Sequence, residues 1–560
     1  MTAPSTRTSK PRRILLLAGV PAILIAASAA TFSDRTRAAG ADSVAVPVPN
    51  PILTSNELLG EAAPDECFNG VGVDYPPINP DGTCDVGEPK TNESYIWGMT
   101  EESGKLYLGS MANAACMVSG QTQLDESIMA ERDLICEYGD SQYAREHPAI
   151  PDAIGDWRPP SIYQYDLATN QLTKYEIRDQ LLKRTLGFRG AGSIDNIAFL
   201  AGSNVFTNSV GIFAFEADTG NFLGSCENPN YTYARKWEAA NGVLYVGVGN
   251  LANGAVLRWN GDANSFPGNF CDDFTEVGRL PTWTASLSIY TGGDGQDRLA
   301  ASTVPIRNSV GVGIYISPPL GPDGLQPGDA DNWQVIWEPS MYETDRIVRD
   351  YGYSGGAVQR FGEWLYWGTI HLPNAAPLTV HQTCSRQFCF GVPANEEELA
   401  ALKDGIFRTG SIWRGRNLEN PATREIQLLY GESELPACHT PHSFESTPTG
   451  WTPLYGHSGF DNPANEYIWQ MAVHDGHLFV GTFDASYGPP ETGADLWRFD
   501  DSNSAAVNED YRGLGDRKNY GIRAMIGLDD ESALMVGMAD PSNLAPGGGW
   551  ELRRLKQPAH

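Results

Sequence analysis

A short strand-like motif recurs seven times along this chain, and no other feature of the sequence limits the fold so strongly. Each copy is an apolar run that ends at a small residue, which is typical of a buried β-strand. The copies begin at Leu106, Phe199, Leu244, Leu299, Leu365, Leu478 and Leu534. A chain of 560 residues is too long for one ordinary core, so repetition of a small unit is expected to build its body.

Strand and turn signals also repeat around each copy. An apolar strand and an Asn-Gly or Asp-Gly hairpin turn precede the motif, as at 241–242 and 475–476. An aromatic strand such as 161–166 follows, and a fourth strand such as 171–176 completes the unit. Seven units of four antiparallel strands predict an all-β protein, a seven-bladed β-propeller over residues 93–556, with long loop insertions in the first and fifth blades.

These repeats resemble those of β-propeller proteins of the WD40, kelch and quinoprotein type. The sequence has no regular Gly-His and Trp-Asp pair and no double glycine in each unit. The resemblance therefore implies an architecture and no particular family. Because propellers serve as enzymes, scaffolds and receptors alike, it implies no activity and no site residues.

The N-terminus has the pattern of an export signal. Lys10, Arg12 and Arg13 precede an uncharged apolar run over 14–32. This predicts that residues 1–30 are a signal peptide, or an uncleaved membrane anchor, because the run is near the length that spans a bilayer.

The remaining boundaries follow from that signal. We expect a flexible tether over 31–60, an extension over 61–92 that contains Cys67 and Cys84, and then the propeller. The protein is expected outside the cytoplasm, secreted, periplasmic or tethered, with membrane contact only through its N-terminal segment. The net charge of −30 repels phosphate backbones, so nucleic acid is not an expected partner.

Cysteine usage agrees with export. The chain has nine cysteines, so at least one thiol is left over. We expect pairing between neighbours in the sequence: Cys67–Cys84, Cys116–Cys136, Cys226–Cys271 and Cys384–Cys389. Cys438 is then free, unless it displaces one of the last two cysteines.

Three insertions interrupt the regular spacing of the repeats. Those over 111–160 and 372–410 follow the second strand of a unit, and that over 431–465 links the fifth unit to the sixth. In an antiparallel blade these connections all lie on one face. That decorated face is therefore the predicted functional face, because loops on a rigid scaffold carry most binding and chemistry.

Histidines gather in these insertions, and they offer a candidate metal site. Imidazole and thiolate are ligands that transition metals prefer. The candidate metal ligands are His371, His439, His442, His457 and Cys438. The alternative is a set of loop histidines beside a disulfide cysteine. Acidic glycine loops at 293–297 and 329–332 offer oxygen ligands for calcium, although hairpin turns explain them better.

A second set of polar residues follows the repeated strands. Three positions after the small residue of the motif stand Asn204, Asn250, His371, Asp484 and Asp540. They are candidates for ligand binding around the mouth of the central channel, although Asn and Asp also favour turns. Trp451 and Tyr455 could add aromatic contacts to a ligand, or could hold their long loop in place.

Two functions are compatible with this sequence. The first is an exported binding module that holds a glycan, a peptide, a small molecule or a protein on the decorated face. The second is an exported enzyme, a metal-dependent oxidoreductase, a lyase or a hydrolase, with its site on the same face. Binding is favoured, because no catalytic motif has its required structural context.

Overall fold

A computed structural model describes most of the chain. It covers residues 49–117, 133–150, 154–266, 268–306, 308–371, 378, 380–381, 390–440, 442–484, 493–528, 532–544 and 546–558. The predicted signal peptide, most of the predicted tether, and Cys384 and Cys389 lie outside these residues.

Strand pairing gives seven antiparallel units of four strands, and single bridges join four of these units into one 16-stranded sheet. This arrangement confirms the propeller. The innermost strands are β4 (Glu93–Glu102), β8 (Thr185–Ile194), β12 (Tyr233–Ala240), β16 (Trp283–Thr291), β20 (Tyr353–Phe361), β26 (Asn465–His474) and β30 (Gly521–Leu528). The second strands, which contain the repeated motif, are β5 (Lys105–Ala112), β9 (Ile197–Asn204), β13 (Val243–Gly249), β17 (Asp297–Val304), β21 (Trp364–His371), β27 (His477–Asp484) and β31 (Ala533–Ala539).

Two further strands complete each unit towards the outside. The third strands are β6 (Ile162–Asp166), β10 (Val210–Glu216), β14 (Gly254–Trp259), β18 (Ile314–Ile316), β22 (Ile412–Arg416), β28 (Leu496–Phe499) and β32 (Glu551–Lys556). The outermost strands are β7 (Gln171–Lys174), β11 (Phe222–Asn228), β15 (Phe274–Leu280), β19 (Gln334–Trp337), β23 (Glu425–Tyr430), β29 (Val507–Asp510) and β1 (Ser55–Glu61).

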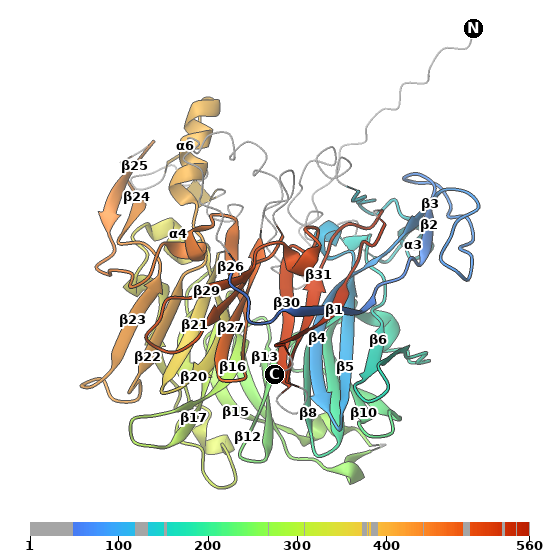
Figure 1. Ribbon diagram of the computed structural model, residues 1–560, viewed down its shortest axis with the longest axis horizontal. Coiled ribbons are helices and arrows are strands. Elements are labelled where there is room, and N and C mark those ends of the chain that lie inside the picture. The colour runs from blue at the N-terminus through green and yellow to red at the C-terminus, as the bar shows by residue number, and fades with distance from the viewer. Residues whose placement is uncertain are drawn as a thin grey trace.

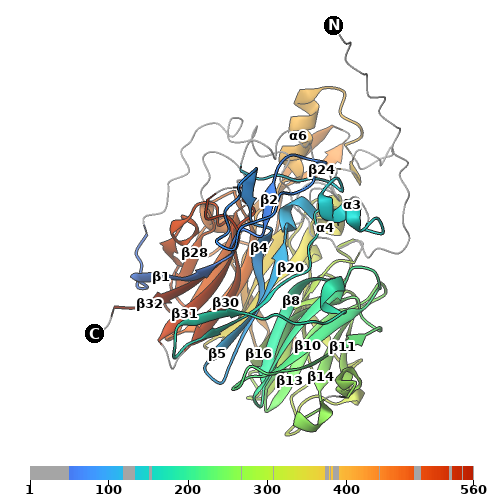
Figure 2. The same cartoon turned by 90° about the vertical axis from the view of Figure 1, so that its right-hand side faces the viewer.

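The seven units close into a ring. Each innermost strand packs against the innermost strand of the next unit, and β30 of the last unit packs against β4 of the first. The outermost strand of the last unit comes from the other end of the chain, because β1 pairs antiparallel with β32 (Figure 2).

The predicted tether is therefore too long at its C-terminal end, since residues 55–60 belong to β1. Most side chains of β1 face solvent at the outer edge of the sheet. The strand consequently has no apolar alternation by which its sequence could identify it.

The repeated small residue of the motif has a packing role. Gly481 of β27 faces Ile522 of the next inner strand, and an added Cβ would lie 2.5 Å from Ile522 Cγ2. Gly109 faces Phe188 of the next unit in the same way. Three more pairs follow this rule: Gly247 with Thr284, Gly368 with Ile468, and Gly537 with Ile96. The motif thus allows close approach between neighbouring blades.

This packing predicts the effect of a single methyl group. Gly481→Ala should lower the free energy of unfolding by about 1–3 kcal/mol, because Ile522 must move out of a filled interface. Gly328→Ala is the matched control, since a Cβ at Gly328 meets nothing within 4 Å. Denaturant unfolding of both variants measures the difference. Equal stability of the two would contradict the packing role.

The connections expected on one face do lie together. In Figure 1, α6 (Glu396–Ile406), β24 (Glu434–Thr440) and β25 (Ser443–Pro448) stand at the same end of the ring as α3 (Gln142–Glu146), and the inner hairpin turns lie at the other end. The hairpin of β2 (Glu66–Phe68) and β3 (Glu88–Lys90) joins them there. We call this end the decorated face.

Three of the predicted disulfides are confirmed. Cys67–Cys84, Cys116–Cys136 and Cys226–Cys271 are all bonded, and Cys438 is a free thiol. Three disulfides fit an oxidising compartment outside the cytoplasm. Within the described ranges, no helix combines the length and the apolar character needed to cross a membrane.

Candidate functional site

A cavity of about 420 Å³ opens on the decorated face, between the fifth unit and the 431–465 insertion that follows it. Its wall combines aromatic, acidic and histidine side chains from β20, β21, β24 and the loops around them. The polar and aromatic lining residues are Tyr342, Tyr353, His371, Phe407, Arg408, Thr409, Glu432, Glu434, His457, Ser458 and Asp461. Two predicted residues, His371 and His457, thus meet at one cavity.

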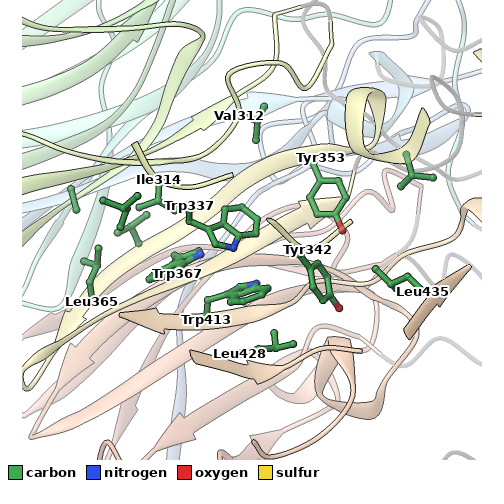
Figure 3. Close-up of a cluster of buried hydrophobic side chains, with 14 of the residues drawn as sticks. Val312, Ile314, Trp337, Tyr342, Tyr353, Leu365, Trp367, Trp413, Leu428 and Leu435 are labelled. Atoms are coloured by element: carbon green, nitrogen blue, oxygen red, sulfur yellow. The ribbon is translucent and has the colours of Figure 1, made fainter. Parts of the chain in front are cut away.

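The floor of the cavity is aromatic and rigid. Tyr342 and Tyr353 are buried at the edge of a tryptophan cluster, and Figure 3 shows their hydroxyl groups directed away from that cluster. His371 packs edge-on against Tyr353, with 4.3 Å between ring centroids. Trp367 and Trp413 behind the tyrosines are fully buried, so close packing keeps the floor rigid.

His371 is a neutral imidazole. Burial, with a smaller contribution from the Arg408 charge, lowers the pKa of His371 to about 3. Its Nε2 lies 3.3 Å from the Thr369 hydroxyl, and its Nδ1 has no hydrogen-bond partner among the described residues. A buried polar nitrogen without a partner is costly to the fold.

A buried ion pair supports the floor. The Arg408 Nε donates to one Glu343 carboxylate oxygen and an Nη donates to the other, each at 2.8 Å. Tyr353 also donates to Glu343 from its hydroxyl at 3.0 Å. Three backbone carbonyls take the other donors of Arg408, among them that of Pro436 at 2.7 Å. Arg408 is therefore fully committed and offers no charge to a ligand.

The rim of the cavity is acidic. Glu432 accepts from His457 Nδ1 at 2.8 Å and from the Ser458 hydroxyl at 2.8 Å. Asp461 accepts only weakly from the His457 backbone, and Glu434 accepts from the Ser446 hydroxyl, so both exposed carboxylates keep free oxygen positions. The rim thus has three carboxylates and one histidine, above a floor that is neutral overall.

The predicted metal ligands do not gather around one point. His439 lies 3.0 Å from the Thr447 hydroxyl, and His442 faces Glu398 at 3.5 Å. Burial, reinforced by Asp345, raises the pKa of Cys438 to about 11, which keeps it a thiol at neutral pH. Within the described ranges, no three His, Cys, Asp or Glu side chains lie close enough to hold a metal ion.

Two of the predicted ligand-binding residues form hydrogen bonds with neighbouring residues of the protein. The Asn204 side chain donates to Glu227 at 3.1 Å and accepts from the Phe206 backbone at 3.0 Å. The Asn250 side chain donates to the Asn230 carbonyl and accepts from two backbone amides of its own turn. Both amides are thereby used within the fold, as the turn interpretation predicts.

The two aspartates of that set are deeply buried. Asp484 and Asp540 are each 1% exposed at the ends of β27 and β31. Asp484 is close enough to Asp495 for its charge to raise the pKa of that neighbour. Burial raises the pKa of Asp540, whose Oδ1 accepts from the Ser542 amide at 2.8 Å. Neither aspartate lines the described cavity.

The two aromatic candidates hold their loop against the propeller. The Trp451 indole donates to the Met341 carbonyl at 2.7 Å and packs edge-on against Trp413. Tyr455 packs beside Tyr430, with 6.1 Å between ring centroids. Both side chains are half-buried, so their contacts are those of anchors.

The aspartates of the acidic glycine loops are bound by arginine side chains or by a backbone amide. Asp294 accepts from Arg298 at 2.7 and 2.9 Å, and these hydrogen bonds lower the pKa of Asp294 to about 2. Asp331 pairs with Arg279, and Asp329 accepts from the Gln326 backbone amide. These contacts are those of hairpin and loop turns.

Comparison with known proteins identifies no family. No family model matches the chain, and neither does any curated protein. Among solved structures, the Dos1 propeller matches with a TM-score of 0.40 at 9% identity, over 83% of this chain and 92% of that one. PhoX of Pseudomonas fluorescens, solved with vanadate, matches with a TM-score of 0.39 at 11% identity, over 90% and 94%.

Hydrazine synthase of Kuenenia stuttgartiensis is similar to the same extent. Its TM-score is 0.39 at 11% identity, over 81% of this chain and 96% of that one. At such identities a similarity concerns architecture and carries no inference about function.

Proposed function

We propose that the protein is an exported binding module that holds a cationic, amine-bearing ligand in the cavity of the decorated face. The observation that carries the proposal is the charge of that cavity. Glu432, Glu434 and Asp461 stand on its rim, whereas its one arginine is neutralised by Glu343. Carboxylates with free oxygens above an aromatic floor suit an ammonium group with an alkyl chain.

The shape of the cavity agrees with a small ligand or a single side chain of a larger one. A volume of about 420 Å³ lies within the range of small-molecule pockets. Tyr342 at the floor offers apolar and π surface. An amine at the rim, with its carbon chain over that floor, satisfies both features.

Matched four-carbon probes test this proposal by calorimetry. Butylamine should bind, whereas butanol and butyrate should bind at least about tenfold more weakly, because only the amine complements the rim. Glu434→Gln should weaken butylamine binding by about two- to fivefold, the contribution of one exposed charge pair.

The control for this variant is Glu445→Gln, which removes the same charge from β25 outside the cavity. Tighter binding of butyrate than of butylamine would contradict the proposal. So would equal losses in the two variants.

The rim also predicts how binding depends on pH. The hydrogen bond and charge of Glu432, with a smaller contribution from Asp461, raise the pKa of His457 above its usual value near 6.5. Below that pKa the protonated histidine offsets one carboxylate. Butylamine should therefore bind about two- to fivefold more tightly at pH 8.5 than at pH 6. His457→Gln should remove this dependence, and a dependence of equal size in that variant would exclude His457 as its source.

A further inference from the structure

The inner strands of the propeller share an irregularity at one level. Each carries a β-bulge opposite the motif of its second strand. The extra residue is Trp97, Arg189, Ala285, Trp469 or Arg523 in five units, and it falls within Arg235–Lys236 and Gly356–Ala357 in the other two. Bulges of this kind redirect side chains and are common beside functional sites.

These bulges line one cavity in the central channel. Its wall includes Trp97, Arg189, Arg235, Ala285, Gly356, Trp469 and Arg523, and we call these seven residues the bulge ring. The cavity has a volume of about 60 Å³, several times the roughly 10–15 Å³ that one water molecule needs in this measure. A small inorganic ion fits such a space.

Three arginines of the bulge ring have no counter-charge among the described residues. None of Arg189, Arg235 and Arg523 forms an ion pair with a described carboxylate, although Arg523 is 2% exposed and Arg235 is 7% exposed. Within the same residues, the Nε of Arg189 and the Nε and one Nη of Arg523 have no hydrogen-bond partner. Three unneutralised cations at one buried level are costly, and they occur in a protein with a net charge of −30.

The remaining ring residues position the arginines and leave space between them. Arg189 lies 5.2 Å and Arg523 lies 6.0 Å from the ring centroid of Trp97, so the same indole packs against both guanidinium groups. Arg523 also lies 5.2 Å from Trp469. Ala285 and Gly356 fill little of the channel, so the cavity stays open beside the arginines.

Burial lowers the pKa values of Arg189 and Arg523, as is expected of charges without counter-charges. Desolvation lowers the pKa of Arg189 to about 10, and desolvation together with the other two arginines lowers the pKa of Arg523. Desolvation would raise the pKa of the neighbouring Tyr233, but the Arg189 and Arg235 charges outweigh it and lower that pKa. An anion among the three guanidinium groups would relieve this repulsion.

We propose that the bulge ring binds a tetrahedral inorganic oxyanion, phosphate or sulfate, between the guanidinium groups of Arg189, Arg235 and Arg523. Planar guanidinium forks match the oxygen spacing of such ions and donate paired, charge-assisted hydrogen bonds to them. Buried Tyr95 packs against Trp469 of the bulge ring, with 6.1 Å between ring centroids. Half-buried Lys236 lines the same cavity.

Calorimetry on protein dialysed free of both ions tests the proposal. Phosphate or sulfate should bind with one site per chain at constant ionic strength, and chloride should not compete at equal concentration. Arg523→Gln should raise the dissociation constant at least about tenfold, the usual effect of losing hydrogen bonds to a buried charge. The tighter of the two ions identifies the natural occupant.

Arg416→Gln is the matched control, because Arg416 is paired on the surface with Glu363 and Glu425. It should bind the oxyanion like the unmodified protein. The proposal is wrong if neither ion binds at millimolar concentration, or if the two variants lose equal affinity.

Crystals of the unmodified protein soaked in selenate give a second test that needs no variant. The anomalous signal of selenium should lie between the three arginines in the channel. A selenate ion found only on the outer surface, with an empty bulge ring, would overturn the proposal. Neither test involves the amine cavity, so each proposal can fail alone.

Discussion

Glu343→Ala should lower the free energy of unfolding by about 3–5 kcal/mol, the largest effect that we expect from a single substitution. The Glu343 side chain is fully buried and neutralises Arg408, whose side chain is 4% exposed. Without the carboxylate, a guanidinium stays buried without a counter-charge, and the Tyr353 hydroxyl loses its acceptor. Denaturant unfolding at neutral pH measures the loss.

A double variant separates lost charge balance from lost packing. Glu343→Met combined with Arg408→Met removes both charges and keeps most of the volume, so it should recover much of the stability. Glu434→Gln on the exposed rim should change the stability by less than about 0.5 kcal/mol. A loss below about 1 kcal/mol for Glu343→Ala would show that the ion pair does not support the cavity floor.

Asp495→Asn should stabilise the protein by about 3 kcal/mol more at pH 8 than at pH 5. Asp495 is 1% exposed, and burial together with the Asp484 charge raises its pKa to about 7. In the unfolded chain this carboxyl has a pKa near 3.9. Between those values the folded state holds a proton that the unfolded state has lost, so stability falls as pH rises.

The comparison of variant with unmodified protein isolates Asp495 from other titrating groups. His371, with its lowered pKa, has the opposite dependence, because the unfolded chain takes up its proton below about pH 6.5. That contribution is the same in both proteins and cancels. Asp501→Asn is the control, since Asp501 is exposed and hydrogen bonds to its own turn lower its pKa. A pH-independent difference for Asp495→Asn would contradict the burial of a protonated carboxyl.

The propeller could be predicted from the sequence because every unit repeats the same packing between strands. The motif glycine that faces the next blade, as Gly481 faces Ile522, recurs in five of the seven copies and marks the second strand. Neighbouring cysteines in the chain also proved to be disulfide partners, because each pair closes a local loop. Strand β1 has no such mark, since its side chains face solvent and its partner strand lies at the far end of the chain.

Only some of the residues that line the cavity could be predicted from the sequence. His371 was a candidate because it follows the motif, and His457 because it stands in an insertion. Glu343 and Arg408, in contrast, meet across a separation of 65 residues that only the folded chain closes. Histidines that lie near each other in sequence, such as His439 and His442, instead have different neighbours. Proximity in an insertion therefore predicted the face and not the ligand set.

The bulge ring did leave a signal in the sequence. Trp97, Arg235, Gly356 and Trp469 each stand nine residues before the start of a motif copy, at Leu106, Leu244, Leu365 and Leu478. Aligning the units on their motifs brings these positions together. In the second unit the motif copy begins one residue later in its strand, and in the last unit the hairpin connection is longer. Arg189 and Arg523 therefore fall out of that alignment, and only the register of the bulges restores it.

One crystal structure would show whether the cavity of the decorated face binds an amine. Crystals grown with 1,4-diaminobutane should show the diamine in the cavity, with an ammonium group at Glu434 or Asp461 and its carbon chain over Tyr342. An empty cavity at saturating diamine, or an anion in its place, would contradict amine binding.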